Sequence, residues 1–459
     1  MSPNLTVHSK HSVGKRIAAN TGLMMGSKIT SVVLGLGSIF IATKVLGQNE
    51  LGIILFLHAY MLFFSEVTAF QSWQSIIRYG TDDLKNEDAK GLARLLKFGY
   101  KIDALSAVFG FLISVAIFSV ITWCMQSFPD AIPYSEDISA AELQKLAALY
   151  CILILFRQRG VGIGVFRLFD KFHILAFHGA IMPIMRFLGV VIAVLSGAGF
   201  EGFLLAWFLG SLTAYLFLPT ITFWELKGRN LLKLVLRSKS SLKTPRKGLW
   251  PFMIKSNIDS TLAAMTHHLP VMLVMGVFGS AWVAVYKIAE ETAKLLSEGF
   301  KLLDQVIYPE LAKMVSLGEA SKIWKLVTRL ALILLTFGFT MALVVQIFGP
   351  AILGYVTTAD YAQAAPLSSL LILAAALLGV AAPLYPVLYA ADRPERAIYA
   401  RGTGVLIYIV SFFTFSFTIG KMAPGWAAIL GNSAAVIFLI FLAKRTLKKK
   451  VREQIGELK

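Results

Sequence analysis

Charged residues are scarce in this sequence. Asp, Glu, Lys and Arg together make up 15% of its 459 residues, whereas soluble domains carry about 25%. Apolar residues account for 57% of the chain, and its mean hydropathy is +0.70. A soluble fold could not bury this much apolar surface, so the composition excludes a soluble globular protein and predicts an integral membrane protein.

Cysteines and recognisable catalytic motifs are also scarce. Cys124 and Cys151 are the only cysteines and stand in apolar runs, which is typical of inert packing residues. The sequence contains no cluster of metal-ligand residues, no phosphate-cradling glycine loop and no nucleophile motif in its usual context. We therefore expect no catalytic residues, no metal, no cofactor and no enzymatic activity.

Long apolar runs are abundant instead. About 20 consecutive apolar residues can cross a bilayer as a helix, and we predict twelve such spans. The first follows Lys15 and Arg16 and is too long for a cleaved signal peptide, so it is expected to be retained. The predicted spans are 17–43, 51–77, 98–125, 143–163, 172–197, 201–225, 249–277, 280–306, 325–349, 365–391, 397–419 and 425–443.

Positive charges alternate in density along the predicted loops. If the N-terminus is cytoplasmic, 34 of the 44 Lys and Arg residues fall on cytoplasmic ends and loops, and only Lys44 and Lys421 fall on the opposite loops. This asymmetry is the positive-inside pattern of membrane proteins. It explains the net charge of +18 without nucleic acid as a partner, and it predicts that both termini are cytoplasmic.

The predicted spans divide into two sets of six. The division gives a first lobe at 1–225, a basic cytoplasmic linker at 226–248, a second lobe at 249–443 and a basic tail at 444–459. A weak repeat supports it, because VLGQNELGIILF (45–56) aligns with VFGSAWVAVYKI (277–288) at an offset of 232. Six-span repeats must be parallel, so we predict an all-α fold with a pseudo-two-fold axis along the membrane normal and a site between the lobes.

One predicted span carries an unusual set of charges. VYKIAEETAKLLSEGFKLLDQ (285–305) places alternating Lys and Glu residues three and four positions apart, which is one face of a helix. Charges at membrane depth are costly unless they face a bundle interior or water. We therefore expect this face to line a hydrated cavity; the alternative is an amphipathic helix on the membrane surface.

These charges and several others are the candidate substrate-binding residues. The stripe contributes Lys287, Glu290, Glu291, Lys294, Glu298 and Lys301, and the other spans contribute Lys28, His58, Glu66, Arg186, Lys255 and Asp259. Asn20, Ser27, Ser31 and Ser38 share a polar face of the first span that could line the same cavity. Two alternatives stay open: Lys28 could extend to the membrane surface, and Lys255 and Asp259 could simply neutralise each other.

Two segments resemble those of a known family. AANTGLMMGSKITSVVLGLGSIFIATKVLGQNELGIILF resembles the first helical hairpin of oligosaccharide flippases, which belong to the multidrug/oligosaccharidyl-lipid/polysaccharide exporter superfamily. GVFGSAWVAVYKIAEETAKLL (276–296) resembles the hairpin that opens their second half. The resemblance extends over the whole chain in span count and halving, although no short motif is diagnostic.

The resemblance implies a MATE-like fold and a Wzx-type flippase of the bacterial inner membrane. Such proteins move undecaprenyl-diphosphate-linked oligosaccharides to the outer leaflet for O-antigen or exopolysaccharide synthesis by alternating access. The implied partners are this substrate, the lipid bilayer, and a polysaccharide polymerase and chain-length regulator of the same pathway. The coupling ion, H⁺ or Na⁺, is not specified by the sequence.

Two other functions compete with the flippase. A cation-coupled small-molecule or multidrug antiporter of the same superfamily is the second hypothesis, and it would favour acidic over basic cavity groups. A membrane enzyme such as a polysaccharide polymerase is the third. A polymerase would be expected to carry a large outer loop, and the longest predicted outer loop is only about 126–142.

Overall fold

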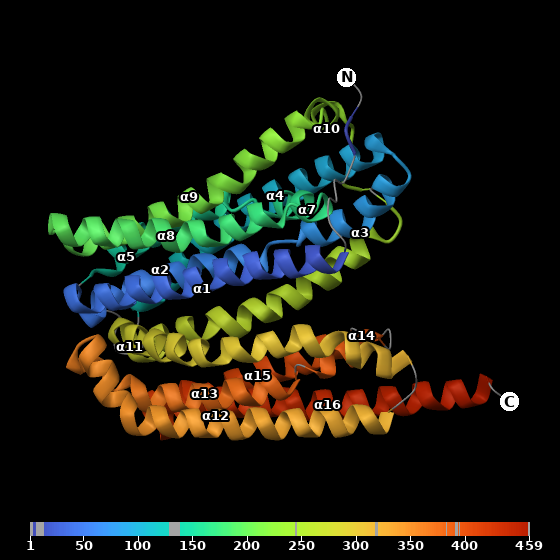
Figure 1. The fold of residues 1–459 in the computed structure, drawn as a ribbon. Coiled ribbons are helices and arrows are strands. Elements are labelled where there is room, and N and C mark those ends of the chain that lie inside the picture. The colour runs from blue at the N-terminus through green and yellow to red at the C-terminus, as the bar shows by residue number, and fades with distance from the viewer. Residues whose placement is uncertain are drawn as a thin grey trace. The chain divides into compact units, whose positions relative to one another are not determined.

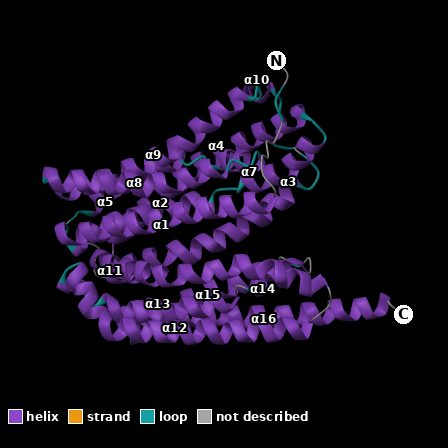
Figure 2. Cartoon of the chain, in the orientation of Figure 1, coloured by secondary structure: helices purple, strands orange, loops and turns teal. Residues whose placement is uncertain are grey.

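The computed structural model is built from helices. It describes residues 3–5, 13–127, 138–243, 246–316, 320–381, 383–390, 393 and 395–457, and within these it gives no side-chain description for 13–19, 296–313, 315–316, 320–322, 386, 389–390 and 448–457. The described residues contain helices and loops and no strand (Figure 2). The expected all-α fold is therefore confirmed.

The chain divides into two compact units, Met1–Ala264 and Met265–Lys459. In the first unit, α1, α8 and α9 lie side by side (Figure 1), and large buried side chains such as Trp207 and Phe203 fill its core. Its helices are α1 (Val13–Val45), α2 (Gln48–Val67), α3 (Ser72–Lys85), α4 (Ala89–Ser127), α5 (Ala140–Cys151), α6 (Leu153–Phe156), α7 (Gly160–Leu168), α8 (Phe172–Ser196), α9 (Gly199–Gly228) and α10 (Leu232–Arg237).

Two spans of the first unit are interrupted. The candidate span Gln48–Lys85 is broken between α2 and α3 at residues 68–71, where Gln71 adopts a left-handed conformation with φ 49°. The candidate span Ala140–Leu168 is broken between α6 and α7 at residues 157–159. Broken helices at membrane depth free backbone groups and are tolerated where they line a protein cavity.

The start of α11 (Leu249–Ser316) packs within the first unit. Leu249 and Met253 lie in a core cluster with Phe98 and Ile102 of α4. The Asn257 side chain donates hydrogen bonds to two carbonyl oxygens at the end of α2, those of Val67 (3.1 Å) and Ala69 (2.8 Å). These contacts explain why Leu249 to Ala264 group with the first unit, beyond the basic linker at 226–248.

The second unit holds the remaining helices. In it α13 lies beside α12 and α16, and α15 lies beside α16 (Figure 1). Its core includes Ile323 of α12, Val380 of α13 and Leu439 of α16. The elements are the rest of α11, α12 (Ala320–Val356), η1 (Ala359–Tyr361), α13 (Ala364–Ala381), α14 (Leu384–Ala390), α15 (Glu395–Thr418), η2 (Gly420–Met422) and α16 (Ala423–Glu457).

Eleven helical segments within the described residues are long and apolar enough to cross a membrane. One of them, Leu249–Leu295, covers the predicted span 249–277 and residues 280–295 of the predicted span 280–306, which meet at Gly279. Gly279 has φ 79° and ψ 177° and therefore breaks the helix. Counting the two parts separately gives the twelve predicted spans. Gly47, which precedes α2, stands 232 positions before Gly279, so the helix breaks agree with the aligned segments of the predicted repeat.

Candidate functional site

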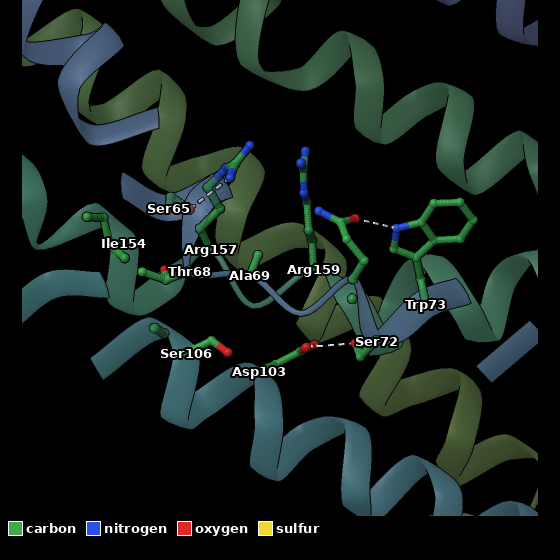
Figure 3. Close-up of a pocket in the computed structure, with 13 residues that line it drawn as sticks. Ser65, Thr68, Ala69, Ser72, Trp73, Asp103, Ser106, Ile154, Arg157 and Arg159 are labelled. Carbon is green, nitrogen blue, oxygen red and sulfur yellow. Dashed lines mark hydrogen bonds between the residues drawn. The ribbon is translucent and has the colours of Figure 1, made fainter. Parts of the chain in front are cut away.

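A polar pocket lies inside the first unit, beside its two helix breaks (Figure 3). Its cavity volume is about 40 Å³, and the pocket is partly open to the outside. Its lining consists of Ser65, Thr68, Ala69, Gln71, Ser72, Trp73, Asp103, Ser106, Ala107, Ile154, Arg157, Arg159 and Gly160. The pocket therefore combines the end of α2, the start of α3, a face of α4 and the break between α6 and α7.

Two arginines from the second break extend into the same region. Because the chain between α6 and α7 is not helical, alternate residues can face the same way, and the side chains of Arg157 and Arg159 point to the same side in Figure 3. Both guanidinium groups contact one carboxylate oxygen, Oε1 of Glu66, at 2.8 Å for Arg157 and 3.4 Å for Arg159. Arg157 also donates to Ser65 Oγ at 2.8 Å.

The two arginines differ in burial. The Arg157 side chain is 4% exposed, whereas that of Arg159 is 41% exposed. Arg157 also lies over the ring of Tyr215, with 5.8 Å from its Cζ to the ring centroid. Arg157 is therefore anchored in the protein, and Arg159 is the arginine more accessible to a ligand.

A second carboxylate holds the two broken helices together. Asp103 Oδ1 accepts a hydrogen bond from Ser72 Oγ (2.7 Å) at the start of α3, and Oδ2 accepts one from the Val161 backbone N–H (3.0 Å) in the first turn of α7. A carboxylate at a helix N-terminus satisfies backbone N–H groups that lack an intrahelical partner. Asp103 thus fixes the positions of both helix starts, on the side of the pocket opposite the guanidinium groups (Figure 3).

An indole ring completes the lining. Trp73 Nε1 donates to Gln71 Oε1 at 2.7 Å, and the Arg167 guanidinium lies over the Trp73 ring at 4.4 Å. This cation–π contact packs α7 against α3. The hydrogen bond restrains the left-handed Gln71 at the first helix break.

Two predicted residues, His58 and Arg186, meet in a second cluster of the first unit. The ring nitrogens of His58 lie 3.1 Å from Tyr150 Oη and 3.2 Å from an Arg186 terminal nitrogen. The Arg186 guanidinium also lies over the Trp207 ring at 5.0 Å. His58 and Glu66 stand two helical turns apart on α2, so this cluster lies about 12 Å along the helix from the arginine pair.

The charged stripe of α11 forms a compensated quartet in the second unit. Lys287 contacts Glu290 at 2.5 Å and Glu291 at 3.4 Å, and Lys294 contacts the same two carboxylates at 3.1 and 3.0 Å. The exposed fractions of Lys287 and Glu290 are 15% and 12%. Pairing at three and four residues neutralises the four charges within one helix, so neither lysine is available as an uncompensated cation.

The other predicted residues behave differently. Lys28 and Lys255 are exposed and Asp259 is half-buried. The side chains of Glu298 and Lys301 lie outside the described residues. The polar face of the first span contacts α8, because Ser27 Oγ donates to the Ala176 carbonyl and Ser31 Oγ donates to that of Gly179 (3.1 Å). These hydroxyls join two helices, as small polar residues commonly do in membranes.

Sequence reasoning missed Asp103, Arg157 and Arg159 as site residues, although the predicted span 143–163 already contained the two arginines. The structure keeps both arginines within a candidate span and buries Arg157. The signal that could have revealed them is RQRG (157–160), two arginines at i and i+2 before a glycine at the end of an apolar run. We interpreted these charges only as topology determinants.

Comparisons with known proteins agree with this architecture. No family model matches the chain. The inner membrane protein YghQ of Escherichia coli is 26% identical over 356 residues, which span 76% of this chain and 95% of that protein. Among solved structures, an inward-facing multidrug resistance MATE family transporter of the MOP superfamily is similar over 92% of this chain and 95% of its own, with TM-score 0.69 and 14% identity.

The lipid II flippase MurJ in an inward closed conformation is also similar, with TM-score 0.64 and 14% identity over 94% of this chain and 90% of its own. At such identities the similarity shows the fold and not the substrate. These two neighbours are a transporter and a flippase. The chain is thus a multi-pass membrane protein with the fold of MOP-superfamily transporters and flippases.

Proposed function

We propose that the protein is a flippase that moves undecaprenyl-diphosphate-linked oligosaccharides from the cytoplasmic to the outer leaflet by alternating access. The observation that carries this proposal is the pair Arg157 and Arg159. Both guanidinium groups contact the same carboxylate, that of Glu66, within candidate membrane-spanning segments. Arginine binds phosphate through two parallel hydrogen bonds and stays charged when buried. An anionic cargo that displaces Glu66 can therefore pair with both guanidinium groups.

Moving a polar head group across the bilayer also requires a polar pocket. A diphosphate and its sugars are strongly hydrated and cannot cross hydrocarbon, so a transporter must replace their water with hydrogen-bonding groups. The pocket supplies hydroxyl, amide and guanidinium groups on Ser65, Gln71 and the arginine pair. The polyprenyl tail can stay in the bilayer while the head group moves. The fold supports the proposal because it is shared with a lipid II flippase.

The test is transport of a fluorescent undecaprenyl-diphosphate oligosaccharide in proteoliposomes. Arg159→Gln is the informative variant, because Arg159 is exposed to the pocket and its removal leaves Arg157 paired with Glu66. We expect it to lose most of the transport. The matched control is Glu225→Gln, which disturbs a carboxylate that lies outside the pocket and contacts Lys171 and Arg229. Full transport by Arg159→Gln would contradict the assignment of this pocket to the cargo.

A small-molecule antiporter is the second candidate. It is favoured by the similarity to a multidrug transporter and by the buried carboxylates Glu290 and Glu291, which a cationic compound could contact. Uptake of a fluorescent organic cation driven by an H⁺ or Na⁺ gradient, with no movement of the lipid-linked saccharide, would select this function. Coupling to either ion and assembly with a polymerase or chain-length regulator stay parts of the proposal.

A further inference from the structure

The carboxylate of Glu66 takes the place that an anionic ligand would take between two arginines. We propose that Glu66 is a built-in substitute for a phosphoryl group: it occupies the diphosphate subsite in the empty protein and is displaced when the cargo binds. This inference rests on the proposed function, because it names the subsite and the exchange by which that function would bind and release its cargo.

The two arginines have more N–H donors than one carboxylate can accept, so they can bind a ligand with more acceptor oxygens. Arg157 directs one terminal nitrogen to Glu66 and the other to Ser65, and its buried Nε–H has no hydrogen-bond partner in the described part of the chain. Arg159 reaches Glu66 only at 3.4 Å and is 41% exposed. Two guanidinium groups offer ten N–H donors, and a diphosphate has more acceptor oxygens than a carboxylate. A diphosphate can therefore use donors that Glu66 leaves.

The placement of Glu66 in the chain allows it to move. Glu66 is in the last turn of α2, directly before the non-helical residues 68–71. The terminal turn of a helix next to a break changes conformation more readily than a helix interior. The arginines are held more firmly, because Asp103 fixes the start of α7 that follows them. A change of position of the Glu66 side chain would therefore expose the guanidinium groups without moving them.

The charge balance predicts the consequence. With Glu66 in place, the formal charges of Arg157 and Arg159 are balanced by those of Glu66 and Asp103; with Glu66 displaced, the pocket presents one net positive charge to the incoming anion. The observed affinity is the difference between binding the phosphate and binding Glu66. Glu66 thus weakens cargo binding, and its return to the arginines helps release the cargo after translocation.

The experiment measures binding of inorganic pyrophosphate to the purified full-length protein in phosphatidylcholine nanodiscs by calorimetry. Glu66→Gln keeps the shape of the side chain and removes its charge. We expect it to lower the Kd for pyrophosphate by about tenfold, the effect of removing one charged hydrogen-bonding competitor. Glu225→Gln is the matched control, because Glu225 is also shared by two cations but pairs with Lys171 and Arg229 instead of the pocket arginines, and its Kd should equal that of the wild type.

A Kd that is unchanged or raised in Glu66→Gln, with the control at the wild-type value, would overturn the proposal. Should Glu66→Gln not fold, Glu66→Asp withdraws the carboxylate by one methylene and should bind pyrophosphate more tightly than the wild type. The same measurement in phosphatidylglycerol nanodiscs tests whether bilayer phosphates occupy the subsite. If pyrophosphate binds in phosphatidylcholine but not in phosphatidylglycerol, the subsite belongs to bilayer phosphates instead of the cargo, and the proposal is overturned.

The transport assay separates this inference from the proposed function. Tighter pyrophosphate binding by Glu66→Gln without any flipping of lipid-linked saccharide would retain the subsite and discard the flippase. The converse result is that the wild type flips the cargo but Glu66→Gln binds pyrophosphate no more tightly than the wild type does. That result would retain the flippase and discard the exchange at Glu66. When both proposals hold, Glu66→Gln should bind more tightly and release cargo more slowly, so its maximal transport rate should fall.

Discussion

The carboxylate of Asp103 lies directly against Gly160, at the point where α7 begins. A Cβ added at position 160 would lie 2.7 Å from Asp103 Oδ2 and even closer to Ser72 Oγ. The absence of a side chain at Gly160 is thus what allows one carboxylate to reach both helix starts. The hydrogen bonds from Ser72 and from the Val161 backbone depend on this approach.

We expect Gly160→Ala to destabilise the protein by about 1–3 kcal/mol, the usual cost of forcing a methyl group into a filled space. Thermal unfolding of the purified protein in detergent would measure the change. Gly35→Ala is the control, because no atom lies within 4 Å of a Cβ placed there and the residue is helical. Equal melting temperatures for the two variants would show that the Asp103 contact does not constrain the helix starts.

Variants of the two pocket arginines should differ in whether they lower the melting temperature or abolish transport. Arg157→Gln removes a buried cation that contacts Glu66 and Ser65, so we expect a marked fall in melting temperature. Arg159→Gln removes a partly exposed cation with one long contact to Glu66, and exposed pairs contribute at most about 1 kcal/mol. Its melting temperature should stay near that of the wild type while transport is lost. The reverse order of melting temperatures would contradict the burial assigned to these side chains.

The stability contributed by the α11 quartet (Lys287, Glu290, Glu291 and Lys294) should depend on its charge balance. Lys287→Met alone leaves Glu290 with reduced compensation, and breaking a largely buried pair costs about 3–5 kcal/mol. Adding Glu290→Gln removes the unbalanced charge and should recover much of that loss. A double-mutant cycle on unfolding would give the coupling. If the two single effects simply add, the residues do not interact as the structure describes.

Asn257 should stabilise the first helix break. Its amide donates to the carbonyl oxygens of Val67, the last residue of α2, and of Ala69, two residues beyond it. Asn257→Leu would leave these acceptors without that donor, at a cost of about 1–3 kcal/mol. The neighbouring Ile258 is 45% exposed, so Ile258→Ala is a suitable control with a small effect. A melting temperature equal to that of the control would show that the amide is dispensable.

Membrane topology offers a test that is independent of the pocket. The Lys and Arg asymmetry predicts that both termini are cytoplasmic. A green fluorescent protein fused at the C-terminus should therefore fluoresce, and an alkaline phosphatase fused there should be inactive. Fusions after Lys44, which is predicted to lie on the opposite side, should give the converse result. Phosphatase activity at the C-terminus would reverse the predicted orientation.

Hydropathy, charge distribution and helical periodicity were sufficient to predict the architecture. Bilayer thickness sets a minimum length for apolar runs, so hydropathy alone located the spans, including the pair that meets at Gly279. Helical periodicity brought Lys287, Glu291 and Lys294 onto one face, and the structure pairs these residues within α11. These inferences are local: they depend on residues within a few helical turns of each other.

The pocket could be located only from the packing of the helices in three dimensions. Glu66 lies in α2, Asp103 in α4 and Arg157 in the break between α6 and α7, and tens of residues separate them, so no periodicity relates them. The sequence also does not predict the break at 157–159. A charged residue at the end of an apolar run gives the same pattern whether its side chain lies in a loop or points into the protein interior. The packing of α4 and α7 resolves this ambiguity, since Asp103 binds the start of α7 and keeps the arginines inside the span.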